Sequence, residues 1–333
     1  MGVSELVTTQ PPSSPHVPVA AMATNKAMLA LELNGATISA GVVSVHTGGL
    51  VGPLSVLPSP AEDSAEEIVG CMVELLRLQH EQARDAHHEV LGVGIAVPGP
   101  FDYDKGLSLR TSGKLSSLRG VDLRTTLEHE LGVPVTFCNN AVSFAMGAWR
   151  VGYPQVNRFV GVILTTGGSA AFLDRGRVAE PRSGAPLAGG VDVFSVTRHT
   201  EAAVRTWAPS RAMAWFHPKV ALEEGYLART GRARPMAFLA RAARNGDTVA
   251  QELYEELGAC WGEVLATLTQ AFAPEIIAFG GLVSANAFEL FGPRAQEVYL
   301  SHSVEPATLV QASSMNVGLV GAAQYGFLSL AGV

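Results

Sequence analysis

The chain is poor in cysteine. Its 333 residues include three, Cys71, Cys138 and Cys260, which lie far apart and form no C-x-x-C pair. Such spacing excludes a disulfide framework and favours a reducing compartment, so we expect a cytoplasmic protein. We expect all three thiols to be packed, including Cys138, which adjoins a polar pair. None of the nine histidines has a metal-like spacing with other ligands, so we predict no metal site.

Long apolar runs and an excess of basic residues are also missing. No stretch reaches about 18 apolar residues, so we predict no membrane span and no membrane partner. The net charge of −7 gives no electrostatic footprint for nucleic acid, and no helix-turn-helix precedes the first strand. Residues 1–26 are rich in Pro, Ser and Thr and lack the pattern of a secretory signal. We expect them to form a disordered leader.

The rest of the chain alternates between strand and helix patterns, which predicts an α/β protein with mixed sheets covered by helices. The length suggests two domains, placed at 27–147 and 148–333, with the last helix packing back on the first domain. Strands are predicted at 28–33, 38–45, 50–57, 90–97, 133–137, 159–164, 169–173, 275–279 and 307–312. Helices are predicted at 64–86, 123–131, 141–150, 247–273, 287–299 and 316–330, and residues 195–246 are predicted to be helical but irregular. The strand–glycine–strand order of 28–45 recurs at 159–173, which indicates a duplicated unit.

The stretch Phe137–Gly147 organises the sequence. It places the polar pair Asn139–Asn140 between a strand and a small-residue helix, at the strand end where α/β folds bind ligands. We expect Asn140 to cap the helix, and a ligand contact is compatible with that role. A carboxamide has no basic group of useful pKa, so Asn140 cannot act as a general base.

Glycine corners follow the predicted strands. They are Asn34–Gly35, Pro98–Gly99–Pro100, Thr166–Gly167–Gly168 and Gly280–Gly281. Glycine after a strand lets backbone amides approach phosphate oxygens, although turns use glycine in any case. The order of the corners, with the Asn pair between the second and the third, is more specific than any one of them.

This order resembles the ROK family of sugar kinases and sugar-responsive repressors. The stretches that resemble family motifs are GVGIAVPGPFD (92–102), RGVDLRTTLEHELGVPV (119–135), IIAFGGLVS (276–284) and VGLVGAAQYG (317–326). The resemblance implies a two-domain actin/hexokinase-like (ribonuclease H-like) fold with a cleft between the lobes, and a homodimer built through the C-terminal domain. It also implies a small-molecule ligand in that cleft.

The chain departs from the family where the family's chemistry lies. In place of the family's phosphate loop, D-x-G-G-T, this chain has Glu32–Leu33–Asn34–Gly35–Ala36. In place of the family's catalytic N-D pair it has Asn139–Asn140, and the family's G-E-x-G-H aligns with GGVDV at 189–193. The zinc-site cysteines of the family are missing. By resemblance, the ligand positions are Gly99, Ser112, Asn139, Asn140, Gly189 and Gly190, and the nucleotide positions are Glu32, Asn34, Gly35, Thr166, Gly167, Gly280 and Gly281.

Three hypotheses follow. The first is a ROK-like pseudokinase that binds a small polyhydroxyl or related metabolite, requires no cofactor and is not an efficient ATP-dependent sugar kinase, because Asn140 replaces the family's Asp. The second is a repurposed enzyme that acts on a non-sugar metabolite without ATP; its candidate groups are Cys138, Asn139, Asn140, Asp192 and His199. The third is an active, glucokinase-like sugar kinase that uses ATP and Mg²⁺ with a relocated base, drawn from Glu32, Asp102, Asp104 and Asp192.

Overall fold

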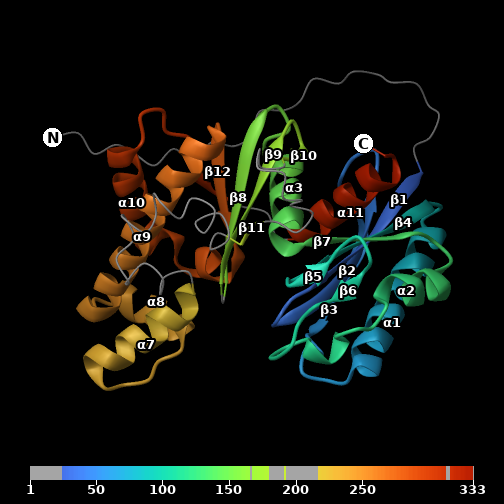
Figure 1. Ribbon diagram of the computed structural model, residues 1–333, viewed down its shortest axis with the longest axis horizontal. Helices are drawn as coiled ribbons and strands as arrows, with labels where there is room; N and C mark the ends of the chain where they lie inside the picture. The colour runs from blue at the N-terminus through green and yellow to red at the C-terminus, as the bar shows by residue number, and fades with distance from the viewer. Residues whose placement is uncertain (1–24, 166, 180–190, 193–216, 313–315, 333) are drawn as a thin grey trace.

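A computed structural model describes residues 25–165, 167–179, 191–192, 217–312 and 316–332 of the chain. The predicted leader therefore lies almost wholly outside the described residues, as does the part of the irregular helical segment before residue 217. The described residues form a two-lobe α/β fold (Figure 1).

Each lobe contains one mixed sheet. The first has the order β3-β2-β1-β4-β7, with β1 (Lys26–Leu33), β2 (Thr37–Ser44), β3 (Leu50–Pro58), β4 (Glu89–Val97) and β7 (Val135–Asn139). The second has the order β10-β9-β8-β12-β13, with β8 (Arg158–Leu164), β9 (Gly168–Asp174), β10 (Arg177–Val178), β12 (Ile276–Gly280) and β13 (Thr308–Gln311). A short strand, β11 (Val191–Asp192), also pairs with β9.

The two sheets have the same strand polarity. In the first, β2 is antiparallel to both β1 and β3, while β4 is parallel to β1 and β7. In the second, β9 is antiparallel to β8 and β10, while β12 is parallel to β8 and β13. This correspondence confirms the duplication predicted from the sequence.

Helices cover both sheets. They are α1 (Ala65–Asp85), α2 (Leu123–Leu131), α3 (Asn140–Gly152), α7 (Pro218–Thr230), α8 (Met236–Arg244), α9 (Thr248–Phe272), α10 (Gly281–His302) and α11 (Val317–Leu330). The connection after β4 adds β5 (Phe101–Asp102), β6 (Leu107–Ser108) and a 3₁₀ turn at Ser116–Leu118. None of the described helices is long and apolar enough to span a bilayer.

The local signals in the sequence explain where these helices begin. Ser64 and Glu67 form a capping box at the start of α1. Asp122 caps α2 through the Thr125 amide, and Gly132 ends that helix in a left-handed conformation. Asp247 caps α9 through the Ala250 amide.

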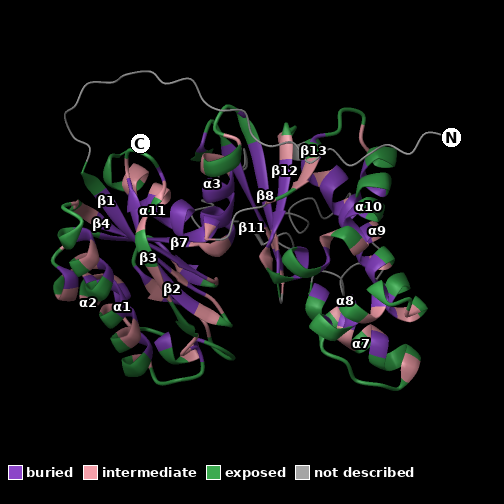
Figure 2. Cartoon of the chain, turned by 180° about the vertical axis from the view of Figure 1, so that it is seen from behind, coloured by how far each residue is buried: buried purple, intermediate pink, exposed green. Residues whose placement is uncertain are grey.

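Alternation along β1 directs its side chains to two cores. Leu29, Leu31 and Leu33 pack in the core that contains α1, whereas Met28 and Ala30 pack with residues of α11. Glu32 continues the second face, so its side chain points toward α11. Figure 2 shows the buried residues in the two sheets and in the helices that pack on them.

Helices α3 and α11 lie side by side between the sheets (Figure 1). A Cβ at Gly147 would lie 1.7 Å from the Val317 carbonyl oxygen, and one at Gly321 would lie 1.6 Å from that of Ser143. Glycine at the crossing therefore lets the two backbones touch. Because α3 packs on β8 and β9 while α11 packs on β1 and β4, this helix pair joins the lobes.

Two elements near the strand ends have other bounds than predicted. Strand β7 begins at Val135 and extends to Asn139, two residues beyond the predicted end. Helix α10 begins at Gly281 rather than at 287, with non-helical dihedral angles at Ala287 marking a kink. The glycine pair that resembles a corner is thus the junction of β12 with its helix.

Candidate ligand site at the carboxyl ends of the first sheet

The β7–α3 junction differs from the prediction in one respect. Asn139, not Asn140, caps α3: its Oδ1 accepts a hydrogen bond from the Ala141 amide at 2.8 Å. The reason is that β7 ends at Asn139 rather than at Phe137, which keeps Asn139 extended and makes Asn140 the first helical residue. The Nδ2 of Asn139 donates to the Tyr103 hydroxyl at 2.9 Å.

Asn140 connects two elements that are far apart in sequence. Its Nδ2 donates to the carbonyl oxygen of Leu33, at the end of β1, over 3.3 Å. Its Oδ1 is buried and has no hydrogen-bond partner among the residues that the structure describes. The amide is therefore oriented with its donor toward β1, and it leaves one acceptor unused.

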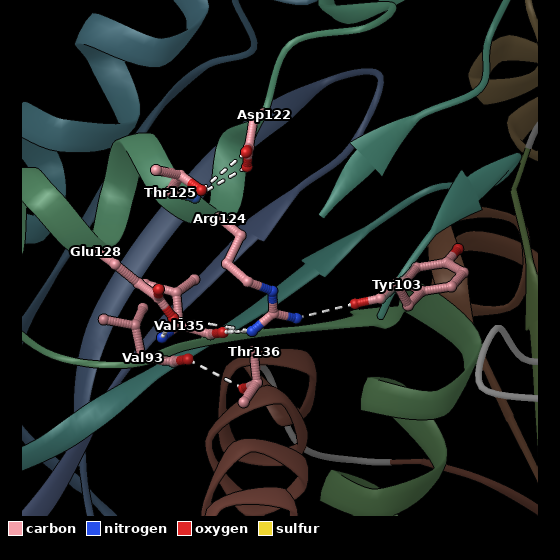
Figure 3. A network of polar contacts seen from close by, with 8 residues as sticks. All are labelled: Val93, Tyr103, Asp122, Arg124, Thr125, Glu128, Val135 and Thr136. Carbon is pink, nitrogen blue, oxygen red and sulfur yellow. Dashed lines mark hydrogen bonds and ion pairs between the residues drawn. The ribbon is translucent and has the colours of Figure 1, made fainter. Parts of the chain in front are cut away.

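Tyr103 owes its position to Arg124 of α2, as Figure 3 shows. The guanidinium donates to the Tyr103 carbonyl at 3.1 Å and to the Val135 carbonyl. Burial raises the pKa of the Tyr103 phenol, which stays protonated at neutral pH. Sequence reasoning missed both residues; the only available signal was that Tyr103 directly follows the P-G-P-F-D stretch.

Gly99 completes this corner. A Cβ there would lie 3.4 Å from the Tyr103 hydroxyl and 3.7 Å from Asn139 Nδ2, so the predicted ligand positions Gly99 and Asn139 are brought together. The Gly99–Pro100 peptide bond is cis. The Gly99 carbonyl accepts a hydrogen bond from Arg110 at 2.5 Å. Ser112, also a predicted ligand position, is exposed.

The first glycine corner is closed by its own side chain. Asn34 Oδ1 accepts hydrogen bonds from the amides of Ala36 at 2.9 Å and Thr37 at 2.8 Å. These are amides that a phosphate loop would present to its ligand. Lys114 Nζ binds the Gly35 carbonyl at 2.8 Å, which ties the corner to the segment after β6.

Glu32 and Cys138 lie on one row of the sheet, since both pair with Ala96 of β4. The Glu32 carboxyl packs against α11, where a Cβ at Gly318 would lie 2.4 Å from Oε2. Burial raises the pKa of Glu32. Burial, and secondarily the nearby Glu32 charge, raise the pKa of the Cys138 thiol. This environment favours a packed thiol over a nucleophile.

The glycines predicted for nucleotide binding in the second lobe are tightly packed. A Cβ at Gly280 would meet the Phe144 ring at 2.2 Å, and one at Gly281, which has a φ of +85°, would meet the Leu164 carbonyl at 2.5 Å. The Gly167 carbonyl accepts a hydrogen bond from the Thr165 amide. Packing and conformation therefore already account for glycine at 280 and 281.

Several predicted positions cannot be placed. Thr166, Gly189, Gly190 and His199 lie outside the described residues, and Asp192 is described only as a backbone pair of Ser169 in β11. Within the described ranges, no group of three or more His, Cys, Asp or Glu side chains could hold a metal ion. The absence of a metal site stays a prediction.

No disulfide joins any two of the three cysteines, all of which lie within the described residues. Cys138 and Cys260 are buried and Cys71 is partly buried, as expected for core thiols. Burial raises the pKa of Cys260 to about 12. The predicted packing of these thiols is thus confirmed.

Comparisons with known proteins find similar sequences and similar folds. The sequence model of the ROK family matches residues 32–190. A glucokinase from Thermotoga maritima is 25% identical over 316 residues, covering 89% of this chain and 96% of that protein. A ROK hexokinase structure from Thermus thermophilus has a TM-score of 0.70 at 22% identity, covering 92% of this chain and 100% of that one.

A second solved structure carries ligands. It is a ROK family glucokinase from Streptomyces griseus in complex with glucose and AMPPNP, with a TM-score of 0.61 at 22% identity, covering 90% of this chain and 98% of that one. The family match, the motif order and the paired sheets point in one direction. Residues 32–190 match the ROK family, and the fold of the chain resembles that of ROK sugar kinases over both lobes.

Proposed function

We propose that the protein binds a small polyhydroxyl metabolite beside Asn139 and Asn140, between its lobes, and that it is not an efficient ATP-dependent sugar kinase. The match to the ROK family and the glucose-bound relative support the ligand class. Amide side chains at the carboxyl end of a strand suit hydroxyl recognition, because each amide offers both donors and an acceptor.

The single observation that carries the proposal is the hydrogen bond from Asn140 Nδ2 to the Leu33 carbonyl. An ionised carboxylate only accepts hydrogen bonds and would be repelled by that oxygen. The site is thus fitted to an amide at the position of the family's base. Losing a general base costs about 10²–10⁴ in rate.

The closed first corner supports the same conclusion about ATP. Asn34 Oδ1 already satisfies the amides of Ala36 and Thr37. A nucleotide phosphate would have to displace this side chain before those amides could bind it. Such competition weakens phosphate binding at the loop.

Two experiments test the proposal. Calorimetry with a panel of hexoses tests the first part, sugar binding, and an ADP-release assay with the same panel at millimolar ATP tests the second part, the lack of efficient kinase activity. We expect saturable binding of at least one sugar and ADP release near the rate without sugar. The variant Asn140→Ala should weaken sugar binding without changing ADP release. Brisk, sugar-dependent ADP release by the wild type would overturn the second part, and a lack of any sugar binding would overturn the first.

An active kinase with a relocated base is the second candidate. The observation that favours it is Glu32, a partly buried carboxyl with a raised pKa and no hydrogen bond or ion pair to any described residue. Such carboxyls are found among catalytic bases. If Glu32 serves as that base, sugar-dependent ADP release will be present in the wild type and lost in Glu32→Gln.

A further inference from the structure

We propose that the ligand bound beside Asn139 carries an anionic group, a carboxylate or a phosphate, and that Arg110 is the residue that recognises it. This deepens the proposed function and rests on it. The combination would be a sugar acid or a sugar phosphate, with hydroxyls facing the amides and the anion facing the guanidinium.

Arg110 belongs to the same corner as the proposed ligand position. The residue follows β6 and is partly buried, and its Nη2 lies 2.5 Å from the Gly99 carbonyl oxygen. Gly99 in turn packs beside the Tyr103 hydroxyl and Asn139 Nδ2. Gly99 therefore places the guanidinium in the same corner as the amide that is proposed to bind hydroxyls.

The positive charge of Arg110 is not compensated by any described residue. Its hydrogen bonds go to backbone carbonyls, those of Gly99 and of Lys114 at 3.4 Å. Its Nε is buried without a partner among the described residues. The neighbouring cations differ, because Lys105 pairs with Asp102 at 3.6 Å and Lys114 pairs with Glu62 at 3.3 Å.

A purely structural role does not require this charge. Arg110 holds two carbonyls, but a guanidinium has five N–H donors and a neutral amide could hold one of those carbonyls. A half-buried cation without a counter-ion is unfavourable on its own. Burial lowers the pKa of Arg110 and, among the described residues, Tyr103 alone acts to raise it, yet an arginine stays charged at neutral pH. The unpaired charge is explained if the ligand supplies the anion.

Glu32, whose carboxyl has no ion pair to any described residue, does not compensate the charge of Arg110. Glu32 lies on the α11 face of β1, against Gly318, and the group on which its charge acts is Cys138. Arginine also suits the proposed partner, because its planar fork matches carboxylate and phosphate oxygens in a bidentate geometry.

Isothermal titration calorimetry on the full chain tests the inference with matched sets of probes. Each set contains a neutral hexose, its uronate and its 6-phosphate, for glucose, mannose and galactose. We expect at least one anionic member to bind ten-fold or more tightly than its neutral counterpart. The uronate and phosphate arms identify which anion the site prefers. Raising KCl from 50 to 300 mM should reduce this preference, since salt screens charge.

Variants separate charge from folding. Arg110→Gln should abolish the preference, Arg110→Lys should retain part of it, and Arg119→Gln should retain all of it, because Arg119 is an exposed arginine of the same segment. Thermal denaturation checks that each variant is folded. If Arg110→Gln fails to fold, the salt dependence of the wild type still decides whether the site prefers anionic ligands because of its charge.

The outcomes distinguish the inference from the function beneath it. If neutral hexoses bind as tightly as their acids, or if the preference does not depend on salt, the inference is wrong and the proposed function stands. If no member of any set binds, both are wrong. A preference that survives in folded Arg110→Gln also overturns the role of Arg110.

Discussion

Asn139 and Asn140 are adjacent and chemically identical, yet their partners differ in kind. Asn139 Nδ2 donates to a hydroxyl, which can reverse its role, whereas Asn140 Nδ2 donates to a carbonyl, which cannot. Sequence reasoning identified the pair and its place at a strand end. It could not assign the cap, because that assignment depends on where β7 ends, nor the Leu33 contact, which spans 107 positions.

We therefore expect Asn140→Asp to destabilise the fold and Asn139→Asp to be tolerated. Aspartate at 139 still caps α3, and the Tyr103 hydroxyl can donate to it. Aspartate at 140 would place a carboxylate against the Leu33 carbonyl, costing about 1–3 kcal/mol. Urea denaturation at pH 7.5 measures both variants, and equal losses of stability would contradict this account.

The partly buried carboxyl of Glu32 predicts a pH dependence. Burial raises its pKa above the ordinary value of 4.5, so the folded state binds the proton more tightly than the unfolded chain. Stability from Glu32 is full below pH 4.5 and is lost as the pH rises through the folded pKa. Glu32→Gln cannot ionise, so it should be more stable than the wild type at pH 7.5, and this advantage should vanish toward pH 4.

Glu67 provides a control of opposite sign. Its hydrogen bonds to Ser64 in the capping box lower its pKa, so its contribution is present above the unfolded pKa and lost in acid. Glu67→Gln should therefore be less stable than the wild type at pH 7.5 and should match it at low pH. Urea midpoints measured from pH 4 to 8 compare the two variants. A Glu32→Gln advantage that does not change with pH would refute the burial argument.

Helices and strands were more predictable than single contacts. Periodicity and caps located α1, α2 and α9 to within a residue or two, because those signals are local. The start of α10 was missed because Gly280–Gly281 also fits a glycine corner that would bind phosphate. The structure explains these glycines by the closeness of Phe144 and Leu164, two residues that no local sequence pattern connects to them.

The crossing of α3 and α11 gives a sharp test of such a packing glycine. Gly321→Ala places a methyl group on the Ser143 carbonyl, so we expect a loss of about 1–3 kcal/mol or more. Gly70→Ala in α1 is the matched control, since a Cβ there meets nothing within 4 Å. Helix propensity alone should make that variant more stable by about 0.5–1 kcal/mol. Similar effects of the two variants on the free energy of unfolding would show that the crossing is not tight.

The duplicated sheet was visible in the sequence as a repeated strand–glycine–strand order. What the sequence could not give is how the two units are joined. Each unit ends in a helix that follows its last parallel strand, α3 after β7 and α11 after β13. Each helix packs on the sheet of the other unit, α3 on β8 and α11 on β1. The exchange depends on small residues on both helices, and neither helix is distinctive by itself.

This exchange makes the first lobe depend on the end of the chain. Leu319, Ala322 and Ala323 of α11 are buried, and α11 covers the face of β1 that carries Met28 and Ala30. A chain that stops after 316 would expose that apolar face, so we expect it to lose its cooperative unfolding transition. A chain that stops after Leu330 is the control, because Ala331 and Gly332 are exposed and its transition should match the full chain. Circular dichroism during urea titration compares the two, and a cooperative, wild-type transition in the shorter chain would mean that the first sheet is stable without its exchanged helix.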